Sequence, residues 1–259
     1  MLFRSWKDNI DLGDLVGLTG EVVTTKRGEL SVKASKWVLT SKALKPLPDK
    51  HHGLHDLEQR VRMRYVDLIV RPEAREMLHV RSNVVASIRK SLTSRGFVEV
   101  ETPMLQVLHG GANARPFKTH INAYDMQLFL RIAPELYLKR LLGGGIDQVF
   151  EINRNFRNEG ADSSHNPEFT MLEFYIAHED YTFAMNTTEN LLKKSVLEAC
   201  GKLNIEYGNH TIDFGVPFAH YTVKESVFIF LSTTSDCISL SSATPFFKRL
   251  REVRISSSF

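Results

Sequence analysis

Two stretches, QVFEINRNFR (148–157) and FTMLEFYIA (169–177), decide the fold of this 259-residue chain. In the first, apolar and polar side chains alternate, and in the second the same period of two separates two sets of side chains. This period is typical of β-strands whose two faces meet different surroundings. A polar loop joins the two stretches, so the sequence predicts an antiparallel hairpin.

Pairing of these strands would place the polar side of one beside the mixed polar and aromatic side of the other. The combined face would carry Glu151, Asn153, Asn155, Arg157, Phe169, Glu173 and Tyr175. For either strand alone, the ordinary interpretation is an antiparallel strand with one face in water. A wetted face seldom needs an aromatic ring such as Phe169 beside Arg157 and Glu173, so we favour a ligand-binding floor.

The side chains of this floor suit a ligand that carries both an amine and a nucleotide phosphate. The guanidinium of Arg157 suits bidentate binding of a phosphate or carboxylate and stabilises negative charge that grows in a transition state. Phe169 offers a flat apolar surface for a purine. Glu173, with the Tyr175 hydroxyl nearby, suits an ammonium group, because a desolvated carboxylate is costly unless a cation compensates it.

On either side of this hairpin, the sequence predicts further strands, helices and a linker. Residues 12–48 predict a hairpin around Lys26-Arg27-Gly28 with too few strands to close a barrel, and residues 45–50 predict a linker. Further elements are expected as a helix at 72–95 with Gly96 as C-cap, a strand ended by Pro103, a helix from Pro134 to Leu142 ended by Gly143-Gly144-Gly145, a helix near 186–200 and a hairpin at 204–214. Residues 218–259 hold thirteen Ser and Thr, no Gly and no clear period.

Composition is that of a soluble globular protein, with 42% hydrophobic and 24% charged residues. No apolar run is long enough for a transmembrane helix, and the opening residues lack the apolar region of a signal peptide. Two cysteines favour a reducing compartment.

The front of the chain is more basic than the rest, since residues 1–72 carry thirteen Lys and Arg against nine Asp and Glu. This excess suits binding to nucleic acid, although a solvated face is the simpler interpretation. His51, His52 and His55 lack partners at metal-ligand spacing, so no metal site is expected.

The string FRNEGADSSHNPEFTMLEFY (156–175) resembles motif 2 of class II aminoacyl-tRNA synthetases, in the version of the lysyl-tRNA synthetases. Three further stretches resemble the same enzymes: PLPDKHHGLHDLEQRVRMRYVDLI (46–69), GGANARPFKTH (110–120) and RIAPELYLKRLL (131–142). Residues 75–103 resemble motif 1, which builds the dimer interface of that class. The resemblance runs almost continuously from about residue 10 to residue 217.

This resemblance implies an α+β fold, in which a class II synthetase antiparallel sheet flanked by helices follows a partial OB-fold β domain. The implied domains are an anticodon-binding OB-fold remnant at 1–50, a catalytic core with motifs 1 and 2 at 51–217, and an aberrant Ser-rich tail at 218–259. The implied partners are lysine, ATP, Mg²⁺, tRNA(Lys) and a second copy of the chain. The compartment would be the cytoplasm, or an organelle if a targeting segment was lost.

The implied reaction is ATP-dependent activation of lysine to lysyl-adenylate, followed by transfer to tRNA(Lys). The resemblance makes Arg157 the catalytic residue. It implies ATP binding by Arg157, Glu159, His165, Asn166 and Phe169. It implies lysine binding by Gly111, Glu135, Arg157, Glu173 and Tyr175. The aspartate and asparagine enzymes need a cation in the side-chain pocket, whereas Glu173 and Tyr175 match a cationic substrate.

Two parts of the family pattern are missing from this sequence. No glycine-rich motif 3 with its arginine follows residue 217, and the carboxylates that usually hold magnesium have no counterpart. The sequence therefore predicts a chain truncated at both ends, with unpaired sheet edges, poor stability and impaired aminoacylation. The alternative is a non-catalytic, RNA-binding or dimerising fragment.

Overall fold

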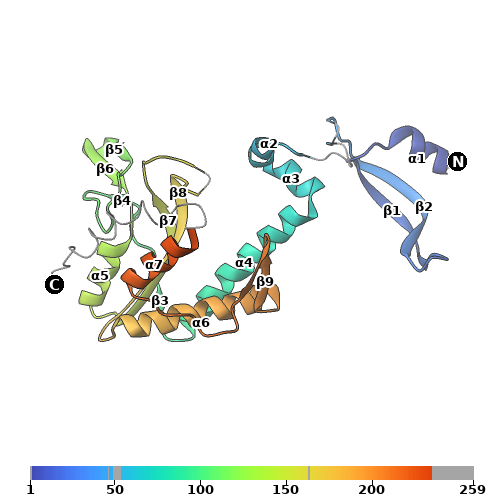
Figure 1. The fold of residues 1–259 in the computed structure, drawn as a ribbon. Helices are drawn as coiled ribbons and strands as arrows, with labels where there is room; N and C mark the ends of the chain where they lie inside the picture. Colours follow the sequence, from blue (N-terminus) through green and yellow to red (C-terminus); the bar gives the residue numbers. More distant parts are fainter. Residues whose placement is uncertain (1, 46, 49–53, 163, 235–259) are drawn as a thin grey trace. The chain divides into compact units, whose positions relative to one another are not determined.

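A computed structural model describes residues 2–45, 47–48, 54–162 and 164–234 (Figure 1). The chain forms two compact units, residues 1–95 and residues 96–259. This division lies away from the domain boundaries expected at residues 50 and 217, which stay predictions. His51 and His52 lie outside the described residues.

The first unit begins with helix α1 (Leu2–Asn9) and a two-stranded sheet. Strand β1 (Leu15–Thr24) pairs antiparallel with β2 (Leu30–Ser41), which confirms the predicted hairpin. Trp6 of α1 contacts Trp37 of β2 edge to face, with ring centroids 5.7 Å apart. Apolar side chains such as Leu15, Val22 and Leu30 remain exposed, as expected for two strands that cannot enclose a core.

Three helices complete this unit: α2 (Leu57–Arg62), α3 (Arg64–Val70) and α4 (Pro72–Thr93). The buried carboxylate of Asp67 pairs with Arg64 at 2.5 Å and with Arg71 at 2.9 Å. Helix α4 begins at Pro72 as predicted, because proline suits the first turn. It ends before Ser94, so Gly96 (φ +91°) lies in the following turn and is not the C-cap.

The second unit contains the predicted ligand floor within a three-stranded sheet of order β3-β7-β8. Strands β7 (Gln148–Phe156) and β8 (Glu168–Ile176) pair antiparallel, which confirms the central prediction. Strand β3 (Val98–Glu99) pairs parallel with β7, so this sheet is mixed rather than wholly antiparallel. The expected strand before Pro103 is thus short.

A second small sheet has the order β4-β6-β5, with antiparallel pairing throughout. It contains β4 (Leu105–Gln106), β5 (Lys118–Ile121) and β6 (Met126–Leu130), with a 3-10 turn at Asn122–Tyr124. Helix α5 (Glu135–Gly143) follows and packs against β7 and β8. Its end at the glycine run confirms that these glycines form a helix end and turn.

The remaining elements are α6 (Tyr181–Cys200), β9 (Asn204–Tyr207), β10 (His210–Asp213) and α7 (Val223–Thr234). Helix α6, orange in Figure 1, starts before the expected residue 186 because the Asp180 side chain accepts hydrogen bonds from the Thr182 and Phe183 backbone N–H groups.

Helix α7 corrects the expectation that residues 218–259 lack regular structure. Thr222 and Glu225 cap each other: the Thr222 N–H donates to the Glu225 carboxylate, and the Glu225 N–H donates to the Thr222 hydroxyl. Such a capping box is a sequence-level helix start. Residues 235–259 lie outside the described part of the chain.

The apolar face of the β7–β8 hairpin belongs to the core of the second unit. Phe150 is fully buried, and its partner Phe174 contacts Phe97 edge to face. Other buried apolar side chains are Leu128, Ile132, Leu138, Val149 and Leu191. Because the apolar face is buried, the opposite face of the hairpin is the place to look for a site.

None of the helices among the described residues is both long and apolar enough to cross a lipid bilayer.

Candidate functional site

The register of β7 and β8 brings the predicted floor residues onto one face. Glu151 lies opposite Glu173, and Asn155 lies opposite Phe169. Residues directly opposite in an antiparallel pair project from the same face of the sheet. The predicted convergence of the two polar faces is therefore confirmed.

Arg157 lies just after β7, at the end of this floor. Its backbone N–H donates to the Pro167 carbonyl at 2.8 Å, which fixes the strand end across the hairpin. Its guanidinium carbon lies 5.1 Å from the centroid of the Phe169 ring, a cation–π arrangement. The Nε atom is buried and makes no hydrogen bond with the described residues. The guanidinium thus retains donor capacity for an anion.

Glu173 and Tyr175 form the acidic end of the floor. The Tyr175 hydroxyl donates to the Glu173 carboxylate at 2.8 Å. Burial raises the pKa of Glu173, and the charges of Glu135 and Glu151 raise it further, against the opposing effects of the Tyr175 bond and the Arg131 charge. Burial and the bond to Glu173 also raise the pKa of Tyr175, so its hydroxyl stays protonated at neutral pH. A site with excess carboxylate favours a cation.

Gly111 and Glu135 meet although they lie far apart in the sequence. Gly111 has φ +86°, and a Cβ atom there would lie 2.9 Å from Cβ of Glu135 and 3.3 Å from Cβ of Ala133. Glu135 is the first residue of α5 and pairs with Lys139 at 2.5 Å. The close approach requires glycine at position 111, because any side chain would displace Glu135.

The loop between β7 and β8 holds the other predicted nucleotide-binding residues. Glu159 accepts a hydrogen bond from the Arg115 backbone N–H at 3.2 Å. The His165 ring lies 2.9 Å from Asp162, whose pKa is lowered by hydrogen bonds from the Ser164 backbone and the His165 ring.

Asn166 lies exposed on the same loop, and Ser163 lies outside the described residues. In the structure, Arg157 therefore contacts Phe169, Glu173 contacts Tyr175, and Gly111 contacts Glu135. Glu159 instead contacts the Arg115 backbone, and His165 contacts Asp162. The ligand contacts of all these residues stay predictions.

Sequence reasoning missed Arg131, which forms a buried ion pair with the floor residue Glu151. Arg131 Nη1 lies 2.6 Å from Glu151 Oε1, and the two side chains are 0% and 1% exposed. The hydroxyl of Thr102 donates to the other oxygen of Glu151 at 2.7 Å. The available signal was an arginine that interrupts the apolar segment 128–133, since a buried charge requires a partner.

Comparison with known proteins matches residues 56–245 to the family of tRNA synthetases class II (D, K and N). The chain belongs to this family of class II synthetases. The matched range extends beyond residue 217, where the sequence resemblance was expected to end. The boundary of the tail at that residue stays a prediction.

Bacterial lysine–tRNA ligases are among the proteins that this chain resembles. The chain is 54% identical to that of Burkholderia multivorans and 53% identical to that of Pectobacterium carotovorum subsp. carotovorum, each over 225 residues covering 87% of this chain and 44% of the relative. It is 56% identical to that of Ectopseudomonas mendocina over 217 residues, or 84% of this chain and 43% of the relative. The chain thus spans less than half the length of these relatives.

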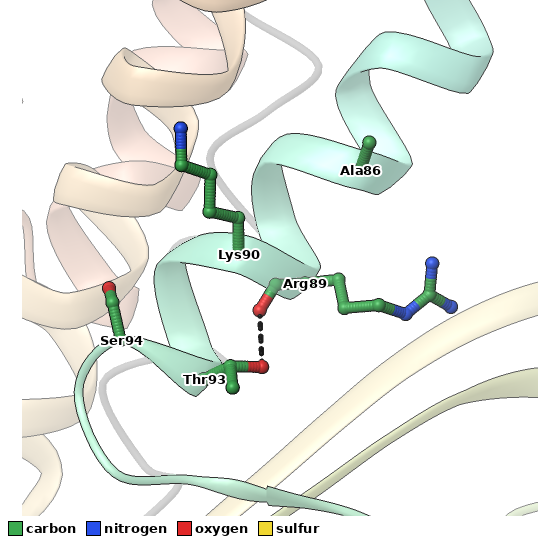
Figure 2. Close-up of a pocket in the computed structure, with 5 residues that line it drawn as sticks. All are labelled: Ala86, Arg89, Lys90, Thr93 and Ser94. Atoms are coloured by element: carbon green, nitrogen blue, oxygen red, sulfur yellow. Dashed lines mark hydrogen bonds between the residues drawn. The ribbon is translucent and has the colours of Figure 1, made fainter.

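A surface hollow lies on the first unit of this class II synthetase chain, and none of the residues predicted to bind ligand lines it. Figure 2 shows its lining of Ala86, Arg89, Lys90, Thr93 and Ser94 at the end of α4. The side chains of Arg89 and Lys90 point to different sides of the helix, and Thr93 donates to the Arg89 carbonyl. Because its two cations diverge, the hollow offers no focused anion site.

The part of this class II synthetase chain that the structure describes contains no group of three or more His, Cys, Asp and Glu side chains able to hold a metal ion. The candidate site on the described residues brings together hydrogen-bonding groups, fixed charges and the Phe169 ring.

Replacing Gly111 with Ala is expected to lower the stability of this class II synthetase chain more than the same change at an unobstructed glycine. A positive φ costs about 1 kcal/mol for a residue with a Cβ, and the new methyl group would displace Glu135. The control is Gly145→Ala, where φ is +92° and nothing lies within 4 Å of the added Cβ. The thermal unfolding temperature should fall in both variants, and it should fall further in Gly111→Ala, because only there does the methyl group meet Glu135. Equal unfolding temperatures would contradict the contact.

Proposed function

We propose that the protein is a lysine–tRNA ligase, which converts lysine and ATP to lysyl-adenylate and pyrophosphate and then transfers the lysyl group to tRNA(Lys). The observation that carries the proposal is that Glu173 and Tyr175 share one sheet face with Arg157 and Phe169. One end of this face suits an ammonium, and the other suits a nucleotide phosphate beside a purine. The relatives named lysine–tRNA ligase support the same activity.

At the acidic end, Glu173 and Tyr175 bind the ε-ammonium group of lysine. Glu135 and the Gly111 backbone receive the α-amino group. The raised pKa of Glu173 supports this assignment, because a half-buried carboxylate near Glu135 and Glu151 gains most from a ligand that brings positive charge. An acid or amide side chain would gain nothing comparable there.

At the other end, Arg157 binds both the lysine carboxylate and the α-phosphate of ATP. Phe169 stacks on adenine, while Glu159, His165 and Asn166 contact adenine and the outer phosphates. A carboxylate oxygen of lysine attacks the α-phosphorus and pyrophosphate leaves. No protein nucleophile is needed, so the enzyme acts by orienting the reactants and stabilising the developing charge.

A second candidate, an RNA-binding or dimerising protein without catalysis, rests on the first unit. Exposed cations suit a phosphate backbone, and the β1–β2 hairpin exposes Lys26, Arg27, Lys33 and Lys36. Within the proposed ligase, this hairpin forms the partial OB-fold that contacts tRNA, residues 75–103 form the dimer interface, and the cytoplasm is the compartment.

The two candidates are separated by titrating the purified chain with amino acids in a calorimeter. For a lysine–tRNA ligase we expect lysine to bind about 100-fold more tightly than aspartate or asparagine. Lysine-dependent exchange of pyrophosphate into ATP would report adenylate formation. Binding of tRNA without binding of lysine would favour the second candidate, and a preference for aspartate or asparagine would overturn the proposed substrate.

A further inference from the structure

The ion pair of Arg131 and Glu151 is part of a larger network of hydrogen bonds. Glu151 Oε1 accepts hydrogen bonds from Arg131 at 2.6 Å, the Asn153 side chain at 2.8 Å and the Thr102 backbone at 3.2 Å. The Thr102 hydroxyl donates to Oε2. Burial by itself raises the pKa of Glu151, but the bonds from Thr102, Arg131 and Asn153 outweigh it and hold that pKa below its ordinary value.

Arg131 also ties together segments that carry the proposed lysine-binding residues. Its Nε donates to the Arg154 carbonyl of β7 at 2.8 Å, and its backbone carbonyl accepts from the Phe156 N–H at 3.0 Å. Shortly after Arg131 the chain enters α5, whose first residue is Glu135. The pair therefore links the start of α5 to the strand that lies beside Glu173.

The electrostatic arrangement places a compensated carboxylate next to an uncompensated one. Glu151 lies directly opposite Glu173 in the β7–β8 register. Arg131 balances the charge of Glu151, whereas Glu173 receives only the neutral hydroxyl of Tyr175 among the bonds described. A buried charge left without its partner is strongly unfavourable and affects its neighbours.

We propose that Arg131 and Glu151 are positioning residues that determine substrate charge: as a neutral buried pair, they hold Glu135 and Glu173 in place and leave the floor negative, so that a cationic side chain is selected. The inference rests on the proposed function and extends it to the floor residue Glu151 and its buried partner Arg131. Neutralising Glu151 would leave the Arg131 cation unpaired near Glu173, where it competes with the ammonium of the substrate.

The test compares Glu151→Gln with the parent chain for two ligands, lysine and 6-hydroxynorleucine, which carries a hydroxyl in place of the ε-ammonium. We expect lysine affinity to fall by about tenfold or more, with the affinity for the hydroxyl analogue changed less than about twofold. The control is Glu168→Gln, an exposed position on the other face of β8, where neither affinity should change. Equal losses for both ligands would mean a merely structural role and would overturn the proposal.

A double variant, Arg131→Met with Glu151→Leu, guards against a trivial loss of folding. It removes both charges together, and apolar replacement of a buried pair often preserves stability. We expect it to restore the preference for lysine over the hydroxyl analogue to within about threefold of the parent, since the net charge beneath the floor is unchanged. A double variant with the same loss of preference as Glu151→Gln would argue against charge selection.

A third measurement needs no lysine binding, so it separates this inference from the proposed function. NMR titration of the Glu173 carboxyl carbon reports its pKa in a setting shared with Tyr175, Glu135, Glu151 and Arg131. In Glu151→Gln we expect this pKa to fall by about one unit, because a like charge is lost and a cation is exposed. An unchanged or higher pKa would overturn the inference. Absence of lysine binding by the parent would overturn only the proposed function.

Discussion

Replacing Glu173 with Gln is expected to lower lysine affinity by about 100-fold or more and to make the ligand-free chain more stable at neutral pH. The loss follows because the neutral amide no longer pairs with the ε-ammonium. The gain follows because the folded chain disfavours the charged carboxylate, as its raised pKa indicates. The amide oxygen still accepts the Tyr175 hydroxyl hydrogen bond, so the local structure is preserved.

The sign of the pH effect makes this prediction specific. The pKa of Glu173 in the folded chain lies above its ordinary value of 4.5, so the stability cost of its charge is absent below that value and grows as the pH rises through the folded pKa. The stability advantage of Glu173→Gln should therefore appear at neutral pH and disappear in acid. Urea unfolding at several pH values measures this difference directly.

Lysine binding should show the complementary pH dependence. The ammonium of lysine keeps its charge up to a pH of about 10, so affinity should rise with pH as Glu173 ionises and then level off. The Glu173→Gln variant should bind weakly with no such rise. Glu168→Gln, on the opposite face of β8, is the matched control. Unchanged lysine affinity in Glu173→Gln would remove the central support for a lysine enzyme.

The variant Arg157→Ala is expected to bind a sulfamoyl analogue of lysyl-adenylate about two to three orders of magnitude less tightly than the parent chain does. The guanidinium lies beside Phe169 with a buried Nε that makes no bond to the described residues, so it retains donor capacity for an anion. Arg157→Lys keeps the charge but loses the planar fork, and should still bind about tenfold less tightly than the parent.

The control for Arg157 is Arg154→Ala, an exposed arginine of β7 whose side chain lies 3.5 Å from Glu168. Calorimetry should show unchanged affinity for the analogue in this variant. Adenosine without the lysyl group should bind Arg157→Ala nearly as well as the parent, because the Phe169 ring remains. A uniform loss for adenosine and the analogue would indicate a disturbed fold rather than a missing anion contact.

Local signals in the sequence were sufficient for the parts of the fold that they describe directly. The period of two in residues 148–157 and 169–177 predicted both β7 and β8 and the face that each side chain occupies, since pleating alone sets that alternation. Pro72 correctly marked the start of α4. Helix α7 was missed although Thr222 and Glu225 supplied its start signal, because the Ser- and Thr-rich composition around it concealed the helix.

The parallel pairing of β3 with β7 and the contact between Gly111 and Glu135 join residues far apart in the chain. Neither has a local period that could reveal it. The contacts of the residues predicted for the nucleotide were also unforeseen: Arg157 lies against Phe169, and Glu159 accepts a hydrogen bond from the Arg115 backbone. Long-range pairing depends on loop closure and packing, which a single strand or helix does not encode.

The sequence by itself determined the polar and apolar faces of the central hairpin and the chemical types gathered on it, because these follow from the alternation of neighbouring side chains. Only the tertiary structure decided that Glu151 is fully buried and paired with Arg131, 20 residues away, while Glu173 forms no ion pair with the residues that the structure describes. The two glutamates are chemically identical and occupy equivalent positions on adjacent strands. What distinguishes them is their surroundings, since burial and the neighbouring charge determine whether a carboxylate stabilises the fold or attracts a substrate.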